Sequence, residues 1–335
     1  MKIAIHHNPN SFSERWIDYC EKENIDYKLV NAFDNTIVEQ LKDCDVFMWH
    51  HHHSDFKDVI AAKKILFALE HAGIKVFPDF KTGWHFDDKV AQKYLLEAIK
   101  APLVPSYVFY DKQQALNWAK KSTYPKVFKL KGGAGASNVK LVKNYSQAKL
   151  LIIKAFGRGF SQFDRLGYLK ERFNKFKSGK DSFIGVLKGV ARIFIVPEFA
   201  KKQPAEKGYI YFQDFIENNN FDTRVVVINS KYAAAEKRFV RKGDFRASGS
   251  GEFSYSNINI ELIRIAFNVA KKLGLQAVAF DFIEDEKKGP LIVEISYGFG
   301  TTGIKLAPGY WDANLSWYKG SLKLEEQILL DLIEK

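Results

Sequence analysis

The chain has 335 residues, of which 46% are hydrophobic and 27% are charged, a composition typical of a globular protein with two or three domains. No apolar run approaches the ~20 residues of a membrane-spanning helix. The N-terminus lacks the apolar block of a signal peptide, and the two cysteines have no metal-ligand spacing, so we expect reduced thiols in a cytoplasmic protein. The formal net charge of +12 predicts an anionic partner and leaves nucleic acid, nucleotide, acidic saccharide and an anionic membrane surface open.

The first 80 residues alternate between strand and helix patterns. Short apolar runs of high β propensity predict strands at residues 2–6, 26–30, 46–49 and 75–77. Helices are expected between them at residues 13–22, 36–42 and 57–71, the first capped by Ser11 or Ser13 and the last stopped by Gly73. This order predicts a small parallel sheet and a Rossmann-like domain over residues 1–85.

Four consecutive histidines, residues 50–53, follow the third predicted strand. In open α/β sheets ligands bind beyond the carboxyl ends of strands, which favours contact with a metal or an anionic substrate. Four consecutive side chains cannot all face one ion, however. A solvated loop is therefore the alternative interpretation.

A second region begins at Asp87 and Asp88, which can cap a helix with an apolar stripe. The stripe consists of Val90, Ala91, Leu95 and Ala98. A strand at residues 103–109 and a helix at 113–121 are expected next, and Ser146 is expected to cap a helix at 147–156.

Between these elements lies a run rich in glycine and alanine, residues 132–137, flanked by predicted strands at 126–130 and 139–142. A loop without bulky side chains lets backbone N–H groups approach phosphate oxygens, so the run predicts a flap over a nucleotide. It does not open a helix, as a P-loop or a dinucleotide fingerprint requires. A purely structural hairpin turn is the alternative.

Residues 157–207 form a basic insertion, with 12 Lys and Arg residues against five Asp and Glu residues. Their pattern predicts no definite secondary structure. The two interpretations are a solvated insertion and a dedicated surface for an acidic polymer.

The last third of the chain is predicted to consist of strands with two helices. The strands are expected at residues 209–216, 223–228, 232–239, 277–283 and 291–296, with turns at 218–220 and 229–230. The helices are expected at residues 258–272, stopped by Gly274, and at 324–333.

Two acidic residues, Asp281 and Glu294, lie in otherwise apolar strands, where a carboxylate is costly to bury without a partner. If the two strands form a hairpin, both acids can share one face, and Ser296 joins Glu294 through the period of two. Two carboxylates and a neutral oxygen suit Mg²⁺ held jointly with phosphates. Pairing of both acids with lysines at a core edge is the structural alternative.

The order of these parts over residues 75–300 resembles the ATP-grasp superfamily. The matching parts are an Asp-Lys helix start, a strand lysine before the glycine flap, a short acidic hinge, and Asp and Glu on neighbouring strands. Among its members, the chain looks most like the ribosomal-protein glutamate ligase type of carboxylate–amine ligase. The resemblance implies a two-lobed fold with antiparallel sheets, in which residues 86–215 form a small lobe with the flap and insertion, and residues 216–335 form a large lobe with the metal site.

The resemblance also implies roles for individual residues. Phosphate binding is implied for Lys89 and Lys129, with Lys131 as the alternative to the second, and ribose binding is implied for Asp222. The flap corresponds to Gly132, Gly133, Ala134, Gly135, Ala136 and Ser137. The adenine-binding hinge corresponds to Gln213, Asp214, Phe215 and Ile216. The cations that face the γ-phosphate, the acyl phosphate and the substrate correspond to Arg224, Lys237, Arg238 and Arg246. The Mg²⁺ ligands correspond to Asp281, Glu294 and Ser296, the last where the family pattern has Asn.

The implied reaction is ATP- and Mg²⁺-dependent formation of an amide from a carboxylate and an amine, through an acyl phosphate. The chain also looks like uncharacterised ATP-grasp proteins linked to surface-polysaccharide synthesis, which suggests a uronic acid as the carboxylate. Tyr310, Trp311, Trp317 and Tyr318 would then form a platform for a sugar ring, although core packing is the commoner fate of such residues. The alternatives are an ATP-binding module without turnover, suggested by Ser296, and a nucleic-acid-binding protein, suggested by the charge.

Overall fold

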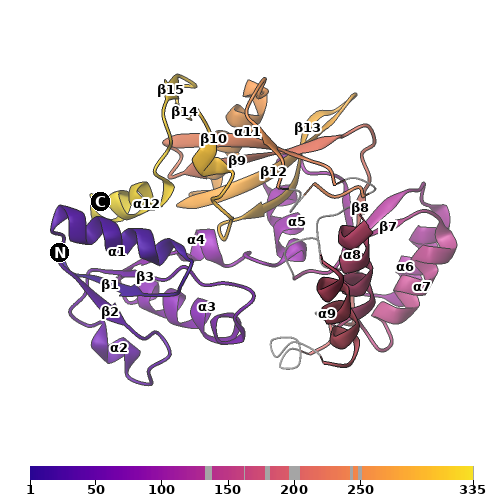
Figure 1. The fold of residues 1–335 in the computed structure, drawn as a ribbon, viewed down its shortest axis with the longest axis horizontal. Helices are drawn as coiled ribbons and strands as arrows, with labels where there is room; N and C mark the ends of the chain where they lie inside the picture. Colours follow the sequence, from indigo (N-terminus) through magenta and orange to yellow (C-terminus); the bar gives the residue numbers. More distant parts are fainter. Residues whose placement is uncertain are drawn as a thin grey trace. The chain divides into compact units, whose positions relative to one another are not determined.

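The structure is a computed structural model that describes residues 1–132, 138–161, 163–177, 182–195, 204–241, 244–247 and 251–334 (Figure 1). The chain forms two compact units. Unit 1 comprises Met1–Phe86, Ala91–Leu103 and Asn218–Lys335, and unit 2 comprises Asp87–Val90 and Val104–Glu217. Within the described ranges, no helix has both the length and the apolar character needed to cross a membrane.

The N-terminal part of unit 1 is a four-stranded parallel sheet in the order β2-β1-β3-β4, which confirms the predicted parallel sheet. Its strands are β1 (Ile3–His6), β2 (Tyr27–Val30), β3 (Val46–Met48) and β4 (Lys75–Phe77). Its helices are α1 (Phe12–Glu23), α2 (Ile37–Gln40) and α3 (Phe56–His71). Of the two candidate caps of α1, the structure selects Ser11, whose side chain accepts a hydrogen bond from the N–H of Ser13.

The histidines that follow β3 are not all in a solvated loop, so that alternative is wrong for His50 and His51, which are buried. The ring of His50 stacks on Phe12 with 3.7 Å between ring centroids, and the hydroxyl of Tyr297 donates to the carbonyl of His51 at 2.7 Å. Burial lowers the pKa of His50 to about 3, so this side chain is neutral at pH 7. The sequence alone could not show this burial because Phe12 and Tyr297 are distant in sequence.

Unit 1 also contains a seven-stranded antiparallel sheet in the order β13-β12-β9-β10-β14-β15, with β11 paired to β10. Its strands are β9 (Phe221–Ile228), β10 (Tyr232–Phe239), β11 (Phe253–Ser254), β12 (Ala277–Asp285), β13 (Gly289–Ser296), β14 (Gly309–Asp312) and β15 (Trp317–Lys319). The remaining helices of this part of the chain are α4 (Phe80–Gly83), α5 (Lys89–Ala98), α11 (Ile260–Leu273), η1 (Ile304–Leu306) and α12 (Leu324–Ile333).

Successive side chains along each strand point to opposite sides, so this sheet has two different faces. On one face, Val225 and Phe280 pack with Phe267 of α11 in one hydrophobic core. On the other face, Val226 belongs to a core shared with Trp16 of the N-terminal helix α1. Even-numbered residues of β9 therefore project to the second face.

Unit 2 is built on a four-stranded antiparallel sheet in the order β5-β8-β6-β7. Its strands are β5 (Ser106–Phe109), β6 (Lys126–Lys129), β7 (Lys140–Val142) and β8 (Ile210–Asp214). Its helices are α6 (Lys112–Lys121), α7 (Tyr145–Ala155), α8 (Arg165–Lys177) and α9 (Phe183–Phe194). A parallel N-terminal domain followed by antiparallel sheets is the predicted fold class, which is confirmed.

Two local predictions in these sheets need correction. Asn144, not Ser146, caps α7, because the Asn144 side chain accepts from the N–H of Gln147 at 3.1 Å. Strand β8 pairs with β5 and β6 rather than with β9, so residues 218–220 connect two sheets instead of turning a hairpin. The turn at 229–230 is confirmed, with both residues in the left-handed region at φ 47° and 56°.

The aromatic residues near the C-terminus lie on the edge hairpin β14–β15. Trp317 is 50% exposed and Tyr318 is 46% exposed, so core packing is wrong for these two residues. The rings of Tyr310 and Tyr318 stack across the hairpin with centroids 5.6 Å apart.

Candidate functional site

The two predicted acids lie opposite each other on a hairpin. Asp281 of β12 is the register partner of Glu294 of β13, which confirms the expected pairing of the two strands. The register shifts between Asp281 and Phe282 and leaves Val293 as the extra residue of a β-bulge, a feature that re-aims neighbouring side chains. Ser296 lies two residues beyond Glu294 and so projects from the same face.

A row of four charged residues crosses the sheet at this level. Glu236, Arg224, Asp281 and Glu294 are successive register partners on β10, β9, β12 and β13. Side chains of register partners project from the same face of an antiparallel sheet, so all four lie together. Glu236 was missed from the sequence, although it lies two residues before Arg238 and the period of two could have found it.

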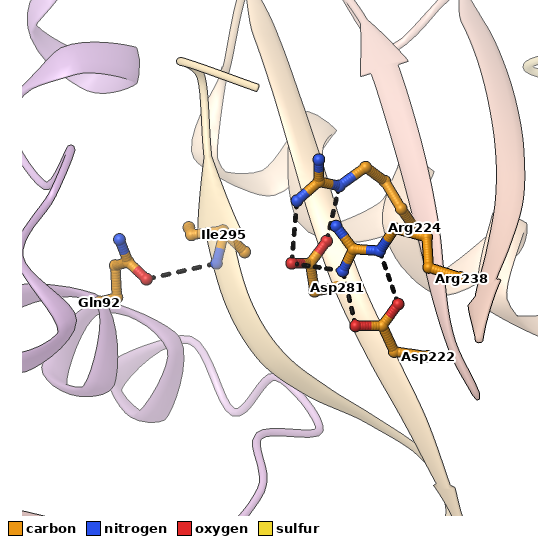
Figure 2. Close-up of polar contacts among 6 residues, drawn as sticks. All are labelled: Gln92, Asp222, Arg224, Arg238, Asp281 and Ile295. Carbon is orange, nitrogen blue, oxygen red and sulfur yellow. Dashed lines mark hydrogen bonds and ion pairs between the residues drawn. The ribbon is translucent and has the colours of Figure 1, made fainter. Parts of the chain in front are cut away.

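Two arginines hold Asp281 in place (Figure 2). Arg224 donates to both carboxylate oxygens of Asp281, at 2.8 and 3.0 Å. Arg238 donates to both oxygens of Asp222 at 2.6 Å, and its Nη2 also lies 2.9 Å from Oδ2 of Asp281. Burial alone would raise the pKa of Asp281, but the positive charges of Arg224 and Arg238 outweigh it and hold the pKa well below the usual range. Asp281 is therefore a fixed anion, and arginines rather than lysines are its partners.

Glu236 contrasts with Asp281 although it lies in the same row. It is 2% exposed, and its Oε2 has no hydrogen-bond partner among the described residues. Burial raises its pKa to about 7, against the opposing effect of Arg224 and Arg238. A Cβ added at Gly303 would lie 1.9 Å from this oxygen, so the segment over Glu236 needs glycine there. Glu236 can change its protonation state near neutral pH.

Gln92 of helix α5 supports the edge strand β13 beside Glu294. It is buried, accepts a hydrogen bond from the N–H of Ile295 at 3.2 Å, and donates to the carbonyl of His85 at 3.2 Å (Figure 2). The sequence predicted that Ala98 lies on the buried apolar stripe of α5, and this prediction is wrong because Ala98 is exposed. Gln92 and Leu96 are buried instead. The position of the polar Gln92 among the apolar residues of this helix was the signal in the sequence that could have identified it.

In unit 2, the predicted phosphate lysine and the predicted hinge lie on adjoining strands. Lys129 Nζ donates to the side-chain oxygen of Gln213 at 2.6 Å, and both residues are buried. Lys126 Nζ pairs with Asp214 at 2.5 Å. These contacts follow from the antiparallel register of β6 and β8. Phe215 and Ile216 follow directly after β8 and are partly buried.

The start of the glycine flap is fixed by residues that the sequence did not single out. The N–H of Lys131 donates to the hydroxyl of Tyr209 at 2.7 Å and to Oε2 of Glu206 at 3.2 Å. The Tyr209 hydroxyl also donates to Glu206, and burial together with the charge of Glu206 raises the pKa of Tyr209. The N–H of Lys89, whose side chain is buried, donates to the carbonyl of Lys131 at 2.9 Å. Gly132 ends this stem, and Gly133, Ala134, Gly135, Ala136 and Ser137 lie outside the described residues.

Two further predicted cations contact residues outside the charged row. Lys237 occupies an odd position of β10, and its Nζ lies 4.7 Å from the ring centroid of Phe221, on the face opposite Arg238. Arg246 pairs with Asp244, with nitrogen–oxygen distances of 2.6 and 2.8 Å. Their predicted roles stay predictions. Across the described ranges, no group of three or more His, Cys, Asp or Glu side chains is arranged to hold a metal ion.

Comparison with protein families matches residues 198–310 to the RimK-like ATP-grasp domain. Over 106 residues the chain is 34% identical to a probable alpha-L-glutamate ligase of Vibrio parahaemolyticus and 36% identical to one of Marinobacter nauticus. Each match covers 31% of this chain and 35% of the relative. The chain thus matches these curated relatives over about a third of their length.

Solved structures show the same fold along nearly the whole chain. D-cycloserine synthetase DcsG has a TM-score of 0.58 at 13% identity, covering 99% of this chain and all of its own. The ATP-grasp ligase PsnB, complexed with a minimal precursor, has a TM-score of 0.56 at 11% identity, covering 99% and 98%. A RimK domain ATP-grasp protein of Sphaerobacter thermophilus has a TM-score of 0.55 at 15% identity, covering 90% and 93%. These findings confirm the resemblance to the ATP-grasp superfamily.

Proposed function

We propose that this chain, which carries a RimK-like ATP-grasp domain over residues 198–310 and the fold of ATP-grasp ligases, joins a carboxylate to an amine using ATP and Mg²⁺. The observation that carries the proposal is the row of Glu236, Arg224, Asp281 and Glu294 across four adjoining strands. All residues of these four strands fall within the matched domain, and the row combines oxygen ligands for a metal with guanidinium groups for phosphate.

The charges of this cluster fit a divalent cation. The row and its neighbours contain four carboxylates and two guanidinium groups, so two negative charges are in excess when all are ionised. These groups are Asp222, Glu236, Asp281 and Glu294, and Arg224 and Arg238. A carboxylate has about four acceptor sites, so Asp281 retains capacity for a metal beside its arginine contacts. We infer that Asp281, Glu294 and Ser296 hold Mg²⁺, which when bound neutralises and orients the phosphates.

The nucleotide is assigned to residues of unit 2. We infer that Lys89 and Lys129 bind the phosphates, that the flap covers them, and that the hinge residues Gln213–Ile216 hold the adenine. The hydrogen bond of 2.6 Å between Lys129 and Gln213 supports this assignment, because it joins the phosphate lysine to the hinge. In this proposal Asp222, Lys237 and Arg246 keep the roles predicted for them.

The proposed reaction has two steps. An oxygen of the substrate carboxylate attacks the γ-phosphorus of ATP, the bond between the β–γ bridging oxygen and that phosphorus breaks, and ADP leaves with the electron pair. The amine then attacks the acyl carbon, inorganic phosphate leaves, and the nitrogen loses a proton. Arg224 and Arg238 stabilise the negative charge that develops on the transferred phosphoryl group. Exclusion of water by the flap would protect the acyl phosphate from hydrolysis.

For the carboxylate substrate we propose a uronic acid of a surface polysaccharide or its precursor. Trp317 and Tyr318 support this choice, since both are about half exposed on one edge hairpin and aromatic rings of this kind can stack on a sugar ring. The net charge of +12 agrees with an acidic substrate.

A screen for ADP release with Mg·ATP, paired carboxylates and amines tests the proposed ligase. The carboxylates to be tested include uronic acids and L-glutamate. Glutamate is included because the relatives are named probable alpha-L-glutamate ligases. Lys129→Ala and Glu294→Gln should each lose activity, whereas the exposed Lys120→Ala and Glu97→Gln should retain it. ATP binding without ADP release under every pair would instead favour a binding module without turnover. Equal activity of all four variants would contradict the site.

A further inference from the structure

Helices α8 and α9 of the basic insertion pack against each other as a hairpin in unit 2 (Figure 1). Arg165 of α8 donates to the carbonyl of Ile193 at the end of α9 at 3.0 Å. At the other end, the rings of Phe176 and Phe183 approach with centroids 6.0 Å apart. The site proposed above uses no residue of this hairpin.

Helix α9 packs on α8 through glycines. Gly185 and Gly189 are its buried residues. A Cβ at Gly189 would lie 3.0 Å from Cδ1 of Leu169 and 3.4 Å from Cβ of Arg172, so the absence of a side chain allows the close approach of the two helices. The large apolar side chains of α9 are consequently left on its other face.

That outer face is an apolar stripe at helical spacing. Phe183, Leu187, Val190 and Phe194 recur at i, i+4, i+7 and i+11, and they are 60%, 52%, 42% and 80% exposed. The neighbouring apolar residues of the same region are Ile184 and Ile195, which are 63% and 61% exposed. Single exposed apolar side chains are ordinary, but a continuous stripe of large ones indicates an interaction surface.

The region that carries this stripe is positively charged. Lys188 and Arg192 lie on α9 itself, which has no acidic residue. The whole insertion, residues 157–207, contains 12 basic against five acidic residues. The occupant of the face must therefore offer both apolar material and negative charge.

We propose that the outer face of α9 docks the protein on the surface of a membrane that contains anionic lipid. A bilayer surface supplies both chemistries at once, because acyl chains receive the aromatic and aliphatic side chains while anionic headgroups attract the net positive charge of the insertion. An acidic polymer would leave the apolar stripe in water. A second copy of this positively charged insertion would repel the first. With 12 residues, α9 lies on the membrane rather than across it. This inference is independent of the proposed ligase activity.

Flotation of the full chain with vesicles tests the docking. Neutral phosphatidylcholine vesicles and vesicles that also contain phosphatidylserine are compared, at low and at high salt. The variant Leu187→Ser/Phe194→Ser removes two members of the stripe. The matched control, Leu150→Ser/Phe80→Ser, removes an exposed Leu and an exposed Phe elsewhere, which are 69% and 51% exposed.

We expect the parent and the control variant to float with anionic vesicles, and salt to weaken that binding. The stripe variant should lose binding by on the order of tenfold or more while its Tm stays that of the parent. Three results would overturn the proposal. The first is no binding of the parent to anionic vesicles, and the second is an equal loss of binding in the control variant. The third is a parent that forms a dimer in sedimentation and binds no vesicles, with the dimer lost only in the stripe variant.

Discussion

Glu236 lies directly opposite Arg224 in the register of β10 and β9, yet its Oε2 has no hydrogen-bond partner among the described residues. Arg224 instead directs Nε and Nη2 to Asp281 on the other side. The sheet therefore contains one carboxylate held as an anion and another whose pKa is about 7.

This difference predicts a pH-dependent effect of Glu236→Gln on stability. Burial raises the pKa of Glu236 from 4.5 to about 7, so the folded state keeps a proton that the unfolded state releases. Folding is consequently disfavoured as the pH rises from 4.5 to 7, and the penalty stays constant above 7, at about 3 kcal/mol for a shift of this size. The variant has no such penalty.

We expect the Tm of Glu236→Gln relative to the parent to be higher at pH 8 than at pH 5, as measured by thermal unfolding. An amide can introduce its own packing cost, but that cost is the same at both pH values. The exposed Glu97→Gln should show no pH-dependent difference. The same Tm difference for Glu236→Gln at both pH values would show that Glu236 is ionised throughout.

Removal of Asp281 should destabilise the fold independently of any ligand. Asp281→Asn leaves the buried guanidinium groups of Arg224 and Arg238 with one carboxylate fewer, and breaking a buried ion pair from one side costs about 3–5 kcal/mol. We expect a clear drop in the denaturant midpoint. The matched Asp18→Asn breaks the exposed pair with Arg15 and should change stability by no more than about 1 kcal/mol. Equal midpoints for the two variants would contradict the arginine cluster.

The sequence predicted those features that depend on local periodicity. Alternation placed Asp281 and Glu294 on one face of a hairpin, and the strand–helix rhythm predicted the parallel sheet. The sequence could not predict the burial of His50, because Phe12 and Tyr297, which contact His50, are distant from it in sequence.

Helix α9 shows a second limit of periodicity. Its apolar stripe has helical spacing, which a core-facing helix would share, and the pattern does not say which face meets the protein. Gly185 and Gly189 decide the question, since they let α9 pack on its glycine face and leave Leu187 outward. Glu206 was likewise counted only as a charge, although it fixes the stem of the flap through the N–H of Lys131.

Gln92 should matter for stability because it satisfies two backbone groups at the edge of the sheet. Gln92→Leu leaves the N–H of Ile295 and the carbonyl of His85 without this partner, at about 1–3 kcal/mol for each unsatisfied buried group. We expect a lower denaturant midpoint for Gln92→Leu. The exposed Gln113→Leu on α6 provides the control and should leave the midpoint within about 0.5 kcal/mol of the parent. A stable Gln92→Leu would mean that β13 is held without this side chain.

We expect Ser296 to set the affinity of the proposed metal site for Mg²⁺. It lies opposite the small residue Ala279 and two residues beyond Glu294, where the family pattern has Asn. A carboxamide oxygen reaches further than a hydroxyl, so Ser296→Asn should lower the Mg²⁺ concentration needed for half-maximal ATP binding, on the order of tenfold, and Ser296→Ala should raise it. Isothermal titration of ATP at a series of Mg²⁺ concentrations measures this without requiring turnover. The exposed Ser256→Asn should have no effect. An unchanged Mg²⁺ dependence in both Ser296 variants would remove this residue from the metal site while leaving Asp281 and Glu294 in it.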